Sequence, residues 1–143
     1  MERVPIGEAA RRSGVKVPTI RYYEDIGLLP APPRSEGNRR FFDETTLRRL
    51  AFIRHARELG FGIEAIRTLI TLQDRPDQTC AAADAIARAR LDDVERRIAS
   101  LTALREELRT MIEGCSHGRV AQCRVIETLG DHDRCIHDSH GPV

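Results

Sequence analysis

The chain has 143 residues, of which 41% are apolar and only 4% aromatic, with no tryptophan. This composition allows a compact domain with an extension and argues against one large aromatic core. The net charge of +1 hides an asymmetry, because residues 1–70 carry 13 basic and 9 acidic side chains and residues 71–143 carry 10 and 13. A basic first half joined to an acidic second half is typical of a nucleic-acid-binding module with a second unit, although ordinary scatter can give the same difference.

The first ten residues lack the apolar core of a signal peptide, and no stretch approaches the roughly 20 apolar residues of a membrane span. We therefore expect a cytoplasmic protein with no membrane partner. Thiols stay reduced in that compartment, so the four cysteines are expected to be metal ligands or redox sensors rather than disulfides.

Residues 1–73 predict a small helical module. Short helices are expected at residues 5–13 and from Pro18 to Asp25 or Ile26, and two such helices about a turn suggest a helix-turn-helix, which is a weak signal alone. Residues 30–38 are rich in Pro, Gly and Ser and precede Arg39-Arg40-Phe41-Phe42, which predicts a hairpin with a basic tip. Asp43 is expected to cap a helix to about Leu59, and a shorter helix is predicted over residues 63–72.

Residues 74–113 predict a linker and one long helix, because residues 81–113 contain no proline and their apolar residues recur at helical spacing. The resulting seam is narrow and comprises Leu91, Val94, Ile98, Leu101, Leu104, Leu108 and Met111. At about 1.5 Å per residue, the helix separates Cys80 from Cys115 by roughly 50 Å. Within one chain, those thiols therefore cannot bind the same metal ion. If two such helices pack antiparallel, Cys80 of one chain lies beside Cys115 and Cys123 of the other, so the spacing points to a homodimer with two composite sulfur sites.

Residues 114–143 predict a metal-binding loop and a Cys/His-rich tail. Three thiolates from two chains suit Pb²⁺ or Hg²⁺, and a fourth ligand would suit Zn²⁺ or Cd²⁺. His117 is a candidate fourth ligand. Alternatively, it is a solvated loop histidine with no part in metal binding. Cys135, His137 and His140 could form a second, weaker metal site or a disordered polar tail, and Cys135 could also complete the main site.

Residues 19–24 (TIRYYE) followed by 27–29 (GLL) resemble the second helix of the MerR family of transcription regulators. The resemblance continues through Arg34, the Arg40-Phe41-Phe42 wing and residues 52–61 (FIRHARELGF), and covers the chain to about residue 130. It implies a mainly α fold, with a winged helix-turn-helix DNA-binding head, a long antiparallel coiled-coil dimerisation helix and a C-terminal metal-binding loop. The resemblance is closest to the metal-sensing branch. There, a cysteine at the position of Cys80 accompanies sensors of divalent zinc, cadmium, lead or mercury, whereas copper and silver sensors use the loop pair alone.

The resemblance also implies residues that face promoter DNA. Arg21, Tyr22 and Tyr23 would lie near the exposed end of the recognition helix, with Arg34 and Arg40 in the turn and wing, and would contact phosphates. Thr19 would lie in the first turn, where bases are read. Phe42 replaces the usual wing tyrosine, so it would pack against a sugar without donating to a phosphate. The alternative is that Tyr22 lies in the core and Tyr23 is exposed.

The expected function is therefore a metal-responsive activator that distorts a promoter when it binds zinc, cadmium or lead, so that RNA polymerase can engage it, and that controls metal efflux or resistance. Two alternatives stay open: a copper(I) regulator that uses only Cys115 and Cys123, and a thiol redox sensor. An enzyme is not expected, because the chain has no nucleophile–base constellation, glycine-rich phosphate loop or paired catalytic carboxylates.

Overall fold

The computed structural model describes residues 3–30, 41–115 and 117–137. The chain divides into two compact units, Met1–Ile86 and Ala87–Val143. The division falls inside one helix, and the three-part domain organisation drawn from the sequence stays a prediction. No helix in the described part of the chain is long and apolar enough to cross a membrane.

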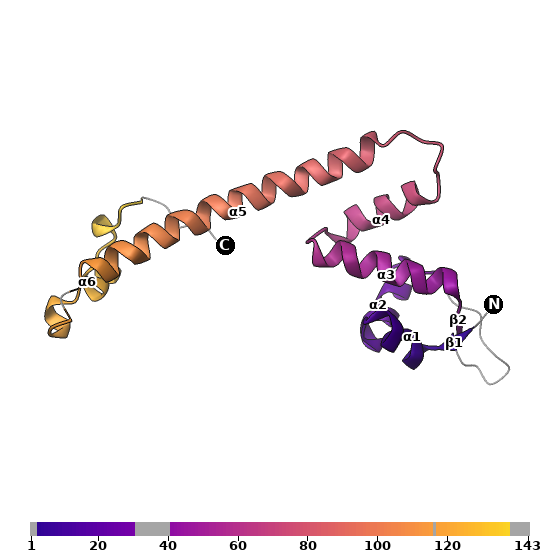
Figure 1. Ribbon diagram of the computed structural model, residues 1–143, viewed down its shortest axis with the longest axis horizontal. Coiled ribbons are helices and arrows are strands. Elements are labelled where there is room, and N and C mark those ends of the chain that lie inside the picture. The colour runs from indigo at the N-terminus through magenta and orange to yellow at the C-terminus, as the bar shows by residue number, and fades with distance from the viewer. Residues whose placement is uncertain (1–2, 31–40, 116, 138–143) are drawn as a thin grey trace. The chain divides into compact units, whose positions relative to one another are not determined.

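The first unit is a bundle of four short helices with a small antiparallel sheet (Figure 1). The helices are α1 (Ile6–Ser13), α2 (Val17–Asp25), α3 (Glu44–Glu58) and α4 (Ile63–Gln73). The sheet pairs β1 (Val4–Pro5) with β2 (Phe41–Phe42), in the register Val4 to Phe42 and Pro5 to Phe41. The sequence predicted the four helices to within two residues at each end. It did not predict β1, and the expected hairpin tip, with Arg34 and Arg40, lies outside the described residues.

Helix α3 begins where the sequence predicts, because Asp43 caps it. The Thr46 N–H donates to Asp43 Oδ1 at 2.9 Å, which satisfies one of the orphan donors of the first turn. This contact also lowers the pKa of Asp43 below its ordinary value. Leu50 and Ile53 of the helix are fully buried, as its spacing predicts.

The turn between α1 and α2 depends on Gly14. Its φ is +72°, in the left-handed region, and its N–H donates to the Ala10 carbonyl at 2.9 Å, closing the end of α1. A Cβ at this position would collide with the Arg54 guanidinium, which donates to the Ser13 carbonyl at 3.1 Å. The lack of a side chain at Gly14 thus lets α3 tie down the end of α1.

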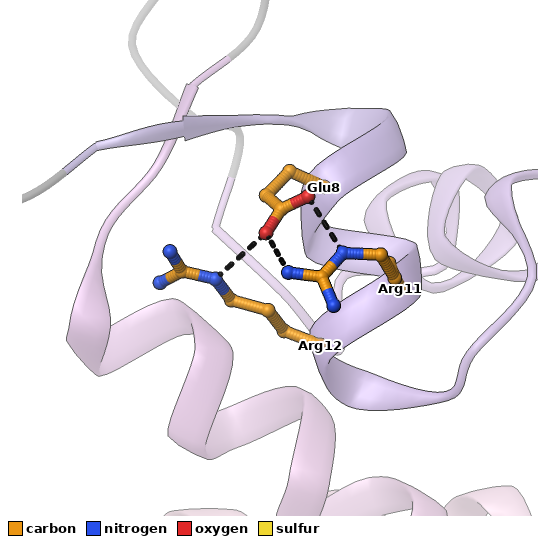
Figure 2. A network of polar contacts seen from close by, with 3 residues as sticks. All are labelled: Glu8, Arg11 and Arg12. Carbon is orange, nitrogen blue, oxygen red and sulfur yellow. Dashed lines mark hydrogen bonds and ion pairs between the residues drawn. The ribbon is translucent and has the colours of Figure 1, made fainter.

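A polar network on α1 joins Glu8 to Arg11 and Arg12 (Figure 2). Arg11 Nε donates to Glu8 Oε2 at 2.9 Å and Arg12 Nε to Glu8 Oε1 at 3.1 Å. The hydrogen bonds from Arg11, then from Arg12, lower the pKa of Glu8 to about 2. The carboxylate therefore stays charged and keeps both arginines on this helix surface down to strongly acidic pH.

The second unit contains most of α5 (Ala81–Glu113), followed by η1 (Val120–Gln122), α6 (Arg124–Gly130) and η2 (His132–Arg134). The sequence predicted both ends of α5 and a helical turn or two within residues 125–129. Figure 1 shows α6 returning beside the C-terminal part of α5. Side chains of α5, α6 and residues 132–135 line a half-open apolar cavity of about 360 Å³ there. The tail continues to contact α5 as far as His137.

The position of Phe42 differs from the prediction that this wing residue packs against a DNA sugar. Phe42 is fully buried in the core with Ile20, Leu50, Ile53 and Ile66, so it cannot pack against a DNA sugar in this conformation. The reason is the pairing with β1, which turns Phe42 inwards and leaves Phe41 only half-buried.

Replacing Phe42 by alanine should therefore lower the free energy of unfolding by about 3–5 kcal/mol, because it leaves a cavity under the sheet. Urea denaturation followed by circular dichroism measures this change. Phe41→Ala is the matched control and should cost clearly less. Equal losses for the two variants would contradict this assignment of the core.

Candidate functional site

Helix α2 carries three of the five predicted phosphate-contacting residues and presents two of them to solvent. Arg21 is exposed and Tyr22 is 50% exposed, while Ile20 and Tyr23 face the core three residues apart on the same helix side. Tyr23 is only 7% exposed and lies in the core cluster with Val15, Leu28 and Leu29, so the prediction that it is exposed is wrong, while its contact with DNA stays a prediction. The alternative, with Tyr22 in the core and Tyr23 exposed, is also wrong, because the structure buries Tyr23 and exposes Tyr22.

Thr19 lies half-buried at a hollow of about 400 Å³ beside the start of α2. Three cationic side chains line the same hollow: Lys16, Arg54 and Arg57. The sequence analysis did not select them. The only signal for Arg54 and Arg57 was the basic character of residues 52–61, because nothing local tells which helical arginines turn towards α2, and Lys16 gave no signal of its own. Glu58 lines the same hollow and pairs with Arg54 at 3.0 Å, so the three cations leave a net positive charge next to the residue predicted to read bases.

The end of α5 and the start of α6 bring Cys115 and Cys123 together. The N–H groups of Gly114 and Cys115 donate to the carbonyls of Thr110 and Ile112 at 3.0 and 3.1 Å, which closes the helix. A Cβ at Gly114 would lie 2.9 Å from Cγ of Arg124, so α6 begins directly against the end of α5. Cys123 immediately precedes α6, and its thiol is within hydrogen-bonding range of Cys115.

The surroundings of Cys123 favour its thiolate. The backbone N–H of Ile126 lowers the pKa of Cys123, and the Val125 N–H and Cys115 thiol act in the same direction against partial burial and the Glu127 charge. The thiolate is the form that binds soft metals and attacks electrophiles. The loop therefore offers one activated sulfur with a second beside it.

Cys80 is exposed and lies directly before α5, where its carbonyl accepts the first helical hydrogen bond from the Asp84 N–H at 2.9 Å. The 33 residues of α5 follow without interruption, a length of about 50 Å. Across residues 3–30, 41–115 and 117–137 of this single chain, no group of three or more Cys, His, Asp or Glu side chains could hold a metal ion. Two sulfurs fit a soft metal but leave its coordination incomplete.

The remaining predicted ligands lie apart from this pair or outside the described residues. His117 is exposed with a φ of 57°, a conformation uncommon for a residue with a side chain. Cys135 lines the apolar cavity, where burial, followed by the Glu107 carboxylate, raises its pKa. His137 Nε2 lies 2.9 Å from Glu106, and His140 is among the undescribed residues. The structure thus does not join Cys135 or His137 to Cys115 and Cys123.

Two short helices about a tight turn, followed by a long helix and a thiol-bearing loop, are the arrangement of a DNA-binding regulator. The family profile described as MerR HTH family regulatory protein matches residues 4–73, and the one described as MerR, DNA binding matches residues 47–111. The chain belongs to the MerR family of transcriptional regulators.

Relatives of known name are similar over almost the whole chain. The HTH-type transcriptional regulator ZntR of Escherichia coli (strain K12) is 40% identical over 87% of this chain and 90% of its own length. The HTH-type transcriptional regulator HmrR of Rhizobium leguminosarum bv. viciae is 38% identical over 88% and 97%. The crystal structure of PbrR691 from Ralstonia metallidurans CH34 in complex with lead(II) superposes with a TM-score of 0.76 at 37% identity, covering 88% of this chain and 98% of that one.

The opposite pKa shifts of Cys123 and Cys135 predict different alkylation rates. In the reduced, metal-free protein at a pH below the ordinary thiol pKa of about 8.5, iodoacetamide should label Cys123 faster than Cys135, because more of Cys123 is thiolate. Raising the pH should narrow the difference between the two labelling rates, because Cys135 then also becomes thiolate. Mass spectrometry of peptides measures both rates, and the urea-unfolded chain, where the difference should vanish, is the control. Equal rates in the folded chain would contradict the assigned environments.

Proposed function

We propose that this chain is a metal-responsive transcriptional regulator that binds promoter DNA as a homodimer and takes a divalent soft metal, zinc, cadmium or lead, as its effector. Each metal would be held by Cys115 and Cys123 of one subunit and by the partner subunit's Cys80. One observation carries this proposal. Cys115 and Cys123 lie together at the C-terminal end of the uninterrupted helix α5, and the exposed Cys80 lies directly before its N-terminal end.

The surface of α5 supports a dimer. Four apolar side chains of its seam are between 51% and 56% exposed in the single chain: Leu91, Ile98, Leu101 and Leu108. They recur at three- and seven-residue steps, which is the pattern of a helix that packs along a second helix. An antiparallel partner would cover this seam and would place each Cys80 near the other subunit's loop.

The chemistry of the donors supports a soft metal. Thiolates are soft, strongly donating ligands, and three of them suit lead, or zinc and cadmium when a fourth ligand joins. The names of the relatives point in the same direction, since PbrR691 was crystallised with lead(II). His117 and the tail residue His140 stay candidates for a fourth ligand, whereas His137 is held against Glu106 and Glu107.

Promoter binding would use the exposed side of α2. Arg21 and Tyr22 would contact phosphates and fix the register, while Thr19, with Lys16 beside it, would lie nearest the bases. Metal binding would clamp each loop against the partner's helix and shift the two heads. The bound promoter would then bend and untwist, so that RNA polymerase can engage it, with a metal-efflux gene as the regulated target. This mechanism implies a cytoplasmic location.

A copper(I) regulator is the second candidate, because Cys115 and Cys123 already lie together in one chain. Two thiolates suffice for a soft monovalent ion. Such a site would need neither Cys80 nor the partner subunit.

Removal of the Cys80 thiol separates the two candidates. The reduced wild-type protein should bind about one cadmium ion per chain with thiolate charge-transfer absorption, because three sulfurs meet at each ion. Cys80→Ser should weaken binding by more than the roughly 10–100-fold that loss of an outer-shell partner costs, and should abolish cadmium-dependent transcription in vitro. Cys135→Ser is the matched control and should bind as the wild type does. A Cys80→Ser protein that binds and activates normally would rule out the composite site and favour the copper type.

A further inference from the structure

Glu107 is a buried carboxylate that the function proposed above does not use. It lies on α5 with only 3% of its surface exposed. A buried carboxylate is costly unless hydrogen bonds replace its water. Here the Ile136 N–H donates to both carboxylate oxygens, at 3.0 and 2.9 Å, and the His137 N–H donates at 3.2 Å.

These hydrogen bonds fix residues 135–137, the docked segment, to the helix. Their donors lie 29 and 30 residues further along the chain, so the contact joins two distant parts of the sequence. Glu106 adds a contact at 2.9 Å to His137 Nε2, but its side chain is half-exposed. Exposed pairs of this kind contribute little, so Glu107 is the main anchor.

Docking places Cys135 where it is a poor ligand. Its side chain lines the cavity formed by Leu104, Leu108 and Met111, away from the Cys115–Cys123 pair. Burial raises the pKa of Cys135, and the adjacent Glu107 carboxylate raises it further. The docked thiol is therefore held away from the two sulfurs that would bind the metal.

We propose that Glu107 is a positioning residue that docks residues 135–137 on α5 and withholds Cys135 from a metal held by Cys115 and Cys123. The third sulfur must then come from the second chain. This inference deepens the proposed function and rests on it. It explains how a chain with four cysteines can keep a site that depends on two subunits.

Amide exchange tests the docking without any metal. In the full-length protein, Glu107→Ala should speed hydrogen exchange at Ile136 and His137 roughly tenfold or more, because both amides lose a charged acceptor. Glu106→Ala is the matched control and should leave both amides slow. Glu107→Gln keeps the side-chain volume and one acceptor oxygen, so it should give intermediate rates if the alanine variant folds poorly. Unchanged exchange in both Glu107 variants, or equal acceleration by Glu106→Ala, would overturn the proposal.

The absorption of bound cadmium tests whether docking keeps Cys135 away from the metal. In the reduced Cys80→Ser protein, cadmium should show the charge-transfer intensity of two thiolates. In the double variant that also carries Glu107→Ala, the intensity should rise to that of three thiolates, because Cys135 is released. In the triple variant that also carries Cys135→Ser, the intensity should return to that of two thiolates. If Glu107→Ala leaves the Cys80→Ser spectrum unchanged, or if Cys80→Ser alone already shows three thiolates including Cys135, the proposal is overturned.

The two measurements also separate this proposal from the composite site. Full cadmium binding by Cys80→Ser that does not depend on Cys135 would refute the composite site. Slow exchange at Ile136 and His137 that depends on Glu107 would still establish the docking, because that measurement contains no metal.

Discussion

The continuity of α5 is the constraint on which the account of this protein depends. Its 33 residues contain neither proline nor glycine, so nothing breaks the helix between Cys80 and the loop that holds Cys115 and Cys123. A helix of that length spans about 50 Å, which prevents the three thiols of one chain from meeting. The same helix leaves a seam of leucine and isoleucine side chains exposed. Both consequences make a second copy of the chain the natural completion of the proposed site.

At the C-terminal end of α5, short-range packing brings together the two thiols of the proposed metal site. Gly114 allows Arg124 to lie against the helix end, and this close approach returns Cys123 to Cys115. The first amides of α6 then stabilise the Cys123 thiolate, while burial of Cys135 opposes ionisation of the fourth sulfur. The environments of Cys123 and Cys135 thus differ, and they shift the pKa values of the two thiols in opposite directions.

The sequence predicted the elements whose signals are local. The ends of α5 and the start of α3 follow from periodicity, the absence of proline and the Asp43 cap, and all three agree with the structure. The MerR-type helical fold was also predicted correctly. The burial of Phe42 and Tyr23 was not, because it depends on a two-residue strand pairing and on helix packing that leave no periodic pattern. Glu107 gave no signal either, since a charged helical residue is ordinarily exposed and its partners lie far along the chain.

Subunit mixing tests the central claim most directly, namely that sulfurs from two chains hold one metal ion. Cys80→Ser chains supply the loop pair, and Cys115→Ser/Cys123→Ser chains supply Cys80. Neither parent protein should bind cadmium with three-thiolate absorption. Unfolding and refolding the two together should produce mixed dimers with one complete site each, and three-thiolate absorption should return in proportion to their number. A mixture that absorbs only as the sum of its parents would contradict the account.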